Sequence, residues 1–172
     1  EIELLAGRLD EAEATLSQST VARLPGPIHI TASARSEILR GKLASARGDH
    51  PRAVEIADTV IERFRRLGAR PFLPAALLLK GTALRARGER AQAETALLDA
   101  RSEAEGHGFR TILWRIDVAL SDIAAEGGDA ARAAVLRSEA GSVIEQIAGS
   151  IDDPELRSSF LALPDVEAVR SG

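Results

Sequence analysis

The sequence predicts an all-α fold built from stacked pairs of helices, and three observations carry this prediction. A six-residue motif that begins with Gly and ends with Ala occurs four times, and its glycines lie 41, 40 and 40 residues apart. The segments on both sides carry apolar residues at helical spacing. Alanine, the strongest helix former, occurs 31 times, and no segment has the alternation typical of a strand. The motifs start at Gly7, Gly48, Gly88 and Gly128.

Each period is interpreted as a helix, a tight turn and a second helix. Before the glycine an apolar stripe recurs, as at Ile38, Leu39, Leu43 and Ala44. A second stripe follows the glycine, as at Ala53, Ile56, Ala57, Val60, Ile61 and Phe64. Both stripes fit 3.6 residues per turn. The pattern predicts helices at residues 1–6, 9–23, 31–47, 51–67, 73–87, 90–105, 110–126 and 130–148.

The turns carry their own signals. The motif glycine should end the first helix in the left-handed conformation, which glycine adopts cheaply. Asp49 and Asp129 are expected to cap the second helix, and Pro51 is tolerated in its first turn. Seven residues before three of the glycines stand Gly41, Gly81 and Ser121, whose small size should let helices approach closely.

The last segment is expected to cover the end of the array. Asp153 and Pro154 predict a short helix that runs to about Leu161. Its apolar residues should lie over the helix at 130–148, because a terminal repeat otherwise exposes its core. These residues are Leu156, Phe160, Leu161 and Leu163. The alternative is a docking peptide for another domain, centred on Phe160.

The first segment is expected to be half a repeat with an uncovered edge. Ile2, Leu4, Leu5 and Leu9 would then pack against a preceding part of the protein or against a second copy. The chain begins with Glu1 and contains no Met, which suggests a piece of a longer polypeptide. We expect one domain over 1–172, with repeats at about 1–27, 28–68, 69–108 and 109–149 and a cap at 150–172.

Composition excludes several function classes. The chain has no Cys, so a disulfide framework and a thiolate site are excluded. No apolar stretch approaches the ~20 residues that cross a bilayer. No phosphate loop or Ser, His and Asp grouping is present, so we expect a non-enzyme without cofactor or metal.

Three single residues could suggest a site but are interpreted otherwise. His50 and His107 are interpreted as surface loop residues, and Trp114 as a packing residue more than a recognition residue.

Charge is unevenly distributed along the chain, although its net value is only −4. Residues 31–90 carry a net charge of +7, and residues 91–172 carry −8. The basic middle could bind an acidic peptide, phosphate groups or nucleic acid. Alternatively it is solvated helix surface with pairs such as Glu62 and Arg66. The shortage of aromatic side chains disfavours nucleic acid.

The repeats resemble those of the tetratricopeptide family. In that family a small residue, the turn Gly and two Ala positions are separated by seven, five and seven residues. The series Gly41, Gly48, Ala53 and Val60 follows this spacing, as does the series Gly81, Gly88, Ala93 and Ala100. The period of 40 exceeds the usual ~34 residues. The resemblance implies a right-handed α-α superhelix of about three and a half helix pairs plus a C-terminal capping helix.

A second resemblance concerns the last third of the chain. The segments Leu113–Ile116, Ile144–Ala148 and Asp153–Leu161 are similar to the closing segment of large multidomain bacterial signalling and transcription regulators. Those chains carry a cyclase, kinase or DNA-binding output domain and an ATPase module before a helical tail. A skew of 20 Arg to 2 Lys also suggests a bacterial source. We expect a cytoplasmic location.

The tetratricopeptide resemblance also implies a binding face. In that family the first helix of each pair lines a concave surface that holds the ligand. The matching polar positions are Arg35, Lys42, Thr82, Arg85, Arg115 and Asp122. Arg35 and Arg115 would clamp a carboxylate or phosphate, unless they are ordinary exposed arginines. The leading hypothesis is therefore a non-catalytic scaffold for a protein, a peptide, another domain of its chain or a small effector. The alternative is a homo-oligomerisation module that uses the edge at Leu4 and Leu5.

Overall fold

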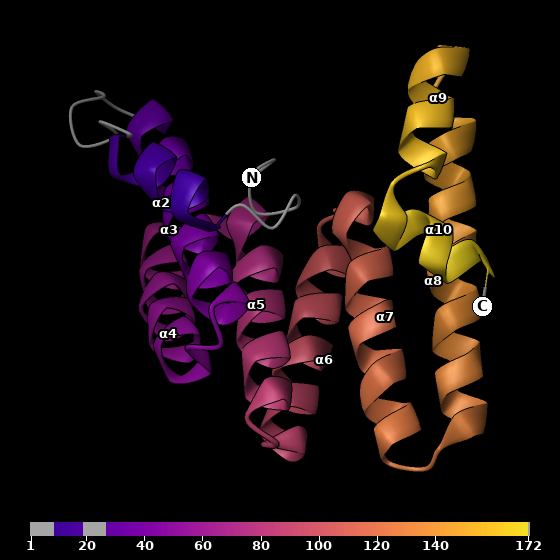
Figure 1. Ribbon diagram of the computed structural model, residues 1–172, viewed down its shortest axis with the longest axis horizontal. Coiled ribbons are helices and arrows are strands. Elements are labelled where there is room, and N and C mark those ends of the chain that lie inside the picture. The colour runs from indigo at the N-terminus through magenta and orange to yellow at the C-terminus, as the bar shows by residue number, and fades with distance from the viewer. Residues whose placement is uncertain (1–8, 19–26, 172) are drawn as a thin grey trace. The chain divides into compact units, whose positions relative to one another are not determined.

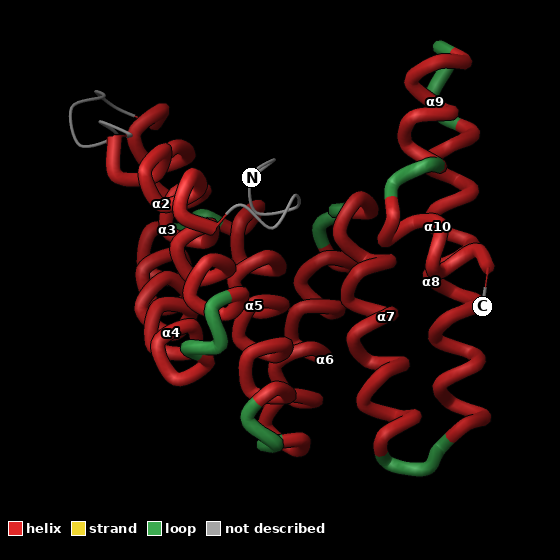
Figure 2. The backbone as a smooth tube through the Cα atoms, in the orientation of Figure 1, coloured by secondary structure: helices red, strands yellow, loops and turns green. Residues whose placement is uncertain are grey.

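The computed structural model describes residues 9–18 and 27–171 of the chain, with side chains at 9–16 and 34–171. Within these ranges every regular element is a helix and none is a strand (Figure 2), so the predicted all-α class is confirmed. The elements are α2 (Leu9–Gln18), α3 (Pro27–Ala46), α4 (His50–Leu67), a short 3-10 turn η2 (Arg70–Phe72), α5 (Leu73–Ala86), α6 (Arg90–Gly106), α7 (Arg110–Glu126), α8 (Ala130–Gly149), α9 (Pro154–Leu161) and α10 (Pro164–Ser171).

The chain divides into two compact units at residue 104, near the end of α6. The described part of the first unit contains α2 to α5 and most of α6, and the second contains α7 to α10. In the part that the model describes, no helix is both long and apolar enough to cross a membrane. The predicted helix at 1–6 and the motif at Gly7 lie outside the described residues.

The turn glycines adopt the predicted conformation. Gly48, Gly88 and Gly128 have φ angles of 80°, 80° and 83°. In each turn the residue after glycine donates its N–H to the carbonyl five residues earlier, as Asp129 does to Ala124 at 2.9 Å. This bond satisfies a carbonyl that the end of the helix leaves without a partner. Gly68 and Gly108, outside the motif, end α4 and α6 in the same way.

The predicted N-caps are also confirmed. The Oδ1 atom of Asp49 accepts a hydrogen bond from the backbone N–H of Arg52 at 3.1 Å. Asp129 does the same for Arg132 at 3.0 Å, and Asp153 caps α9. Each cap contributes about 1 kcal/mol to the stability of its helix. Two predicted positions are wrong: α3 starts at Pro27, because proline suits the first helical position, and His50 begins α4 instead of lying in a loop.

The small residues mark places where helices approach closely. A Cβ atom on Gly81 would lie 2.5 Å from Leu97 Cγ and 3.2 Å from the Ala93 carbonyl oxygen. Forty residues later, the Ser121 hydroxyl donates to the Ala133 carbonyl oxygen at 2.9 Å. The contacts of Gly81 with Ala93 and of Ser121 with Ala133 each join residues twelve apart, on the two helices of a pair. The two repeats thus bring their paired helices together at the same position, one through a glycine and the other through a serine hydrogen bond.

The first unit has α3, α4 and α5 side by side (Figure 1). The stripe predicted for α4 is buried at Ala53, Ala57, Val60, Ile61 and Phe64, while Ile56 is half-buried. The Phe64 ring lies 5.8 Å from that of Phe72 in η2. Burying a Phe or Ile side chain contributes about 1.5–3 kcal/mol, so this stripe stabilises the packing of α4 in the unit.

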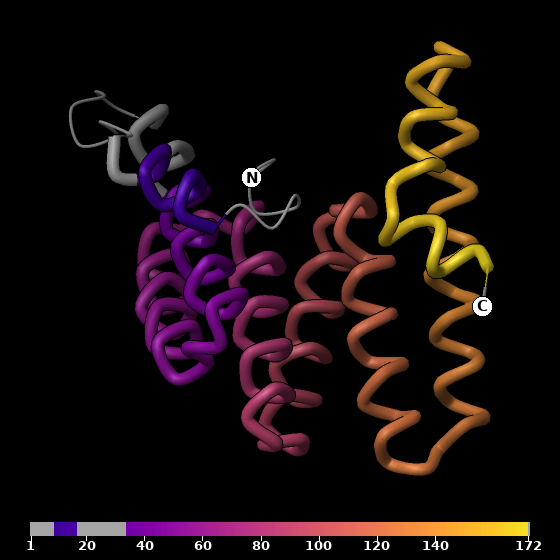
Figure 3. The backbone as a smooth tube through the Cα atoms, in the orientation of Figure 1, coloured from indigo at the N-terminus to yellow at the C-terminus, as the bar shows by residue number. Residues whose placement is uncertain are grey.

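The second unit is a hairpin of α7 and α8, joined at Gly128 and closed by the C-terminal helices (Figure 3). Trp114 is 3% exposed and packs with Ala140 and Ile144, so its predicted packing role is confirmed. Val166 and Val169 of α10 complete this cluster. Helix α10 was not predicted, because two valines three residues apart are a weak periodic signal.

The predicted cap is partly wrong. Helix α9 has the predicted bounds, and Phe160 and Leu161 pack against the Trp114 cluster. Leu156 and Leu163, however, are 63% and 40% exposed. The reason is that α10 brings Val166 into the position that these leucines were expected to cover, and Val166 is fully buried.

Candidate binding surfaces

The six predicted binding residues fall into two groups. Arg35 and Lys42 are exposed on α3, and Thr82 and Arg85 are half-buried on α5, which contacts α3 in the first unit. Arg115 and Asp122 belong to α7 in the second unit. The structure therefore brings four of the six residues into one compact unit.

All six of these residues already interact within the chain, and the contacts of Thr82, Asp122 and Arg115 are as follows. The Thr82 hydroxyl donates to the carbonyl oxygens of Leu78 and Leu79 on its own helix, at 3.0 Å each. The Asp122 carboxylate accepts a hydrogen bond from Arg137 of α8 at 3.3 Å. The Arg115 guanidinium lies 4.4 Å from the centre of the Trp114 ring, a cation–π distance. A ligand at these positions would compete with existing contacts.

A cleft of about 430 Å³ lies between α4, α5 and α6 in the first unit. Its floor contains the buried side chains of Ile61, Leu77 and Ala96. Lys80 Nζ forms an ion pair with Asp58 Oδ1 at 2.7 Å on its border. The remaining lining residues are Glu62, Arg65, Gln92, Thr95 and Asp99.

The sequence analysis did not predict this cleft, because the tetratricopeptide resemblance implies a ligand on the first helix of each pair. A signal was present in the second helices. Asp58, Glu62 and Arg65 follow helical spacing on α4, and Gln92, Thr95 and Asp99 do so on α6. Such polar stripes are typical of any solvated helix face, so the stripes alone do not distinguish a binding wall.

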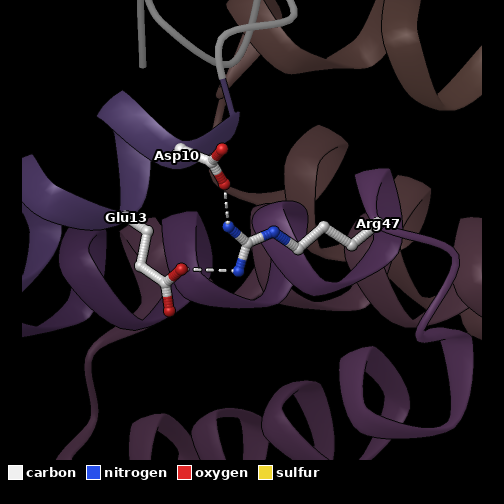
Figure 4. A network of polar contacts seen from close by, with 3 residues as sticks. All are labelled: Asp10, Glu13 and Arg47. Carbon is white, nitrogen blue, oxygen red and sulfur yellow. Dashed lines mark hydrogen bonds and ion pairs between the residues drawn. The ribbon is translucent and has the colours of Figure 1, made fainter.

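A second cleft, of about 310 Å³, is lined by residues of α2, α3 and α4. Its main polar feature is Arg47, whose Nη1 atom donates to Glu13 at 2.6 Å and whose Nη2 atom donates to Asp10 at 2.8 Å (Figure 4). The hydrogen bond with Glu13, together with that to Asp10, raises the pKa of Arg47 above its ordinary value. This arginine therefore joins α2 to α3 and is already engaged by two carboxylates.

Ion pairs neutralise much of the basic middle of the chain. Arg63 contacts Glu37 at 2.5 Å, and Arg70 contacts Glu103 at 3.1 Å. Arg52 contacts Glu55 at 2.6 Å, while the predicted pair of Arg66 with Glu62 is loose at 3.9 Å. Together these contacts favour the interpretation of the basic middle as solvated helix surface.

A third cleft, of about 490 Å³, lies on α8 beside α10 in the second unit. Ala134, Arg137 and Gly141 of α8 line it. These positions lie eighty residues after Val54, Ala57 and Ile61, which α4 buries. Small and charged residues thus replace an apolar stripe on this face of α8, which suits contact with water.

Among the described residues, no group of three or more His, Asp or Glu side chains is placed to hold a metal ion. The edge at Ile2, Leu4 and Leu5 lies outside them, so homo-oligomerisation through it stays a prediction from the sequence. Comparison of the chain with protein-family models, curated proteins and solved structures finds no match.

Proposed function

We propose that this chain is a non-catalytic scaffold that binds a peptide or a protein domain on the exposed face of its first helices. The observation that carries the proposal is the repetition of one hairpin geometry, with the same glycine turn at Gly48, Gly88 and Gly128 and the same close approach in the α5–α6 and α7–α8 pairs. Repetition of this kind would place equivalent side chains of successive first helices, such as α3 and α5, on one face. Extended binding surfaces of helical repeat proteins arise in this way.

The proposal extends to the arrangement of the pairs. Continued stacking would form the right-handed superhelix that the tetratricopeptide resemblance implies, with Arg35, Lys42, Thr82 and Arg85 on its concave side. The context would be the helical tail of a cytoplasmic bacterial signalling or transcription regulator. There the scaffold would hold a partner, a domain of its own chain or a small effector.

The test is selection of peptides from a random display library on the immobilised chain, followed by fluorescence anisotropy with a selected peptide. The double variant Arg35→Glu with Lys42→Glu should weaken binding by about tenfold or more, because it places two like charges where an anionic group would sit. Arg90→Glu, a single charge reversal on the exposed surface of α6, should have no effect.

Circular dichroism should show the same helical content for all variants, since the substituted side chains are exposed. If a selected peptide binds the double variant as tightly as the parent chain, the face of α3 is not the binding site. If selection yields no peptide above background, the peptide-scaffold proposal itself is contradicted.

A further inference from the structure

We propose that the cleft between α4, α5 and α6 binds a short segment of a partner protein that carries one acidic and one basic side chain. This inference rests on the proposed scaffold function but concerns a different face. It follows from three features of the cleft: its apolar floor, its two unengaged opposite charges and its length.

The floor and walls define where a ligand would lie. Leu77 of α5 forms the floor with Ile61 of α4 and Ala96 of α6. The α4 wall carries Glu62 and Arg65, and the α6 wall carries Gln92, Thr95 and Asp99. A peptide lying on this floor would meet charged side chains on both sides.

The charged residues of the cleft differ in what they already contact. Lys80 and Asp58 satisfy each other at 2.7 Å, and the Thr95 hydroxyl donates to the Ala91 carbonyl oxygen at 3.0 Å. Arg65 and Asp99, by contrast, have no ion-pair or side-chain hydrogen-bond partner among the residues that the model describes. They belong to opposite walls and carry opposite charges.

Two such charges select a ligand by complementarity. An acidic side chain of the partner would approach the Arg65 guanidinium, and a basic side chain would approach the Asp99 carboxylate. The methylene groups of a Lys or Arg side chain can lie along the apolar floor while the charged end reaches the wall. A segment with two acidic or two basic side chains would place one of them against a like charge.

The length of the cleft limits the segment. Asp58 and Arg65 are seven residues apart on α4, which corresponds to about 10 Å along a helix. An extended chain covers this length in about three residues. The probe peptides described below therefore separate their two charged side chains by one residue, so that both charges lie within this length.

The experiment is a titration of the uniformly labelled chain followed by amide chemical shifts, which detect millimolar binding. The probes are blocked pentapeptides: Ala-Lys-Ala-Glu-Ala, Ala-Glu-Ala-Lys-Ala, the two like-charged versions and the version with two Gln. We expect at least one mixed-charge peptide to shift amides at residues 58–65 and 92–99. The like-charged and neutral peptides should bind at least about threefold more weakly, since exposed charge pairs are individually weak.

Charge reversal tests the two named residues. Arg65→Glu and Asp99→Arg should each weaken binding of the mixed peptide by about three- to tenfold. The double variant should restore binding with preference for the opposite order of Lys and Glu. Arg90→Glu serves as the matched control, because Arg90 is exposed on α6 outside the cleft.

The outcomes separate this inference from the proposed function. Arg35→Glu with Lys42→Glu should leave the cleft titration unchanged, so loss of either site is seen independently. Equal shifts with all five peptides, shifts confined to residues outside the cleft, or single variants that bind like the parent would each overturn the cleft proposal.

Discussion

Gly81 and Gly141 are both helical glycines, but their surroundings are opposite. A Cβ on Gly81 would collide with Leu97 and approach the Ala93 carbonyl oxygen, whereas nothing lies within 4 Å of a Cβ on Gly141. Glycine at position 81 therefore serves close packing, and glycine at position 141 weakens α8 without such a contact. The two positions form a matched pair for the same substitution.

We expect Gly81→Ala to lower the free energy of unfolding by about 1–3 kcal/mol, because the added methyl group overpacks the contact between α5 and α6. Gly141→Ala should raise it by about 0.5–1 kcal/mol through helix propensity. Urea denaturation followed by circular dichroism measures both changes. Equal effects in the same direction would contradict the close-approach interpretation.

The sequence predicts the role of a single residue well where that role depends only on its neighbours along the chain. Gly48, Gly88 and Gly128 are recognisable from their spacing, and Asp129 from its place before a helix. Binding residues are different, because their availability depends on partners from other helices. Asp122 looks exposed on a helical wheel, yet it pairs with Arg137, which stands fifteen positions later. Nothing in the local pattern of α7 indicates that contact.

Helix α2 has few apolar contacts among the side chains that the structure describes. It is ten residues long, and its buried residues at positions 9–16 are Ala12 and Leu16, which pack with Leu43 of α3 and with half-buried Leu9 and Leu39. Isolated helices of this length are marginal in water, so α2 depends on its contacts with α3. The two ion pairs of Arg47 add a polar connection between α2 and the turn that follows α3.

Arg47→Ala should therefore increase amide hydrogen exchange in α2 while leaving exchange in α4 unchanged. Added salt should have the same effect on the parent chain, because these ion pairs are exposed to solvent. The pKa of Arg47 is higher in the folded chain than in the unfolded chain, so its ion pairs stabilise the fold fully at pH values below the unfolded-state pKa. This stabilisation is lost only as pH rises through the folded-state pKa. For an arginine this loss occurs only in strong alkali. The difference in α2 exchange between Arg47→Ala and the parent chain should therefore stay constant between about pH 6 and about pH 8. Unchanged exchange in α2 would contradict this role.

Arg52→Ala is the control for that experiment, since Arg52 pairs with Glu55 on its own helix α4 and joins no two elements.

The positions of the helices were largely predictable from the sequence. The bounds of α4 to α9 follow from stripes, caps and glycines, whereas α10 has only Val166 and Val169 as a signal. A short helix of this kind is specified by the Trp114 cluster that it covers, which is a tertiary cause.

At the scale of the whole molecule, stability should follow the division into two units. In helical arrays it is approximately a sum of terms within repeats and between neighbours. Trp114 is the only tryptophan of the chain and lies in the second unit, so its fluorescence reports that unit. Circular dichroism reports helices in both units.

Val166→Asp should destabilise the second unit by about 2–4 kcal/mol, because it places a charge in the cluster around Trp114. The midpoint of the Trp114 fluorescence transition should fall in thermal unfolding. Circular dichroism should retain a later transition near the parent midpoint, which comes from the first unit. Asp165→Ala, beside it and exposed, is the control. Coincident transitions in the variant would show instead that the molecule unfolds as one cooperative body.

The positive-φ glycines at 48, 68, 88, 108 and 128 recur every twenty residues, both inside pairs and between them. A genetic crossover between the codons of two of these glycines that lie forty residues apart would join turns of the same geometry. The chain could then gain or lose a complete hairpin without a new type of junction. Length is consequently the most easily altered property of this architecture, and duplication of residues 69–108 is the natural way to engineer a longer version.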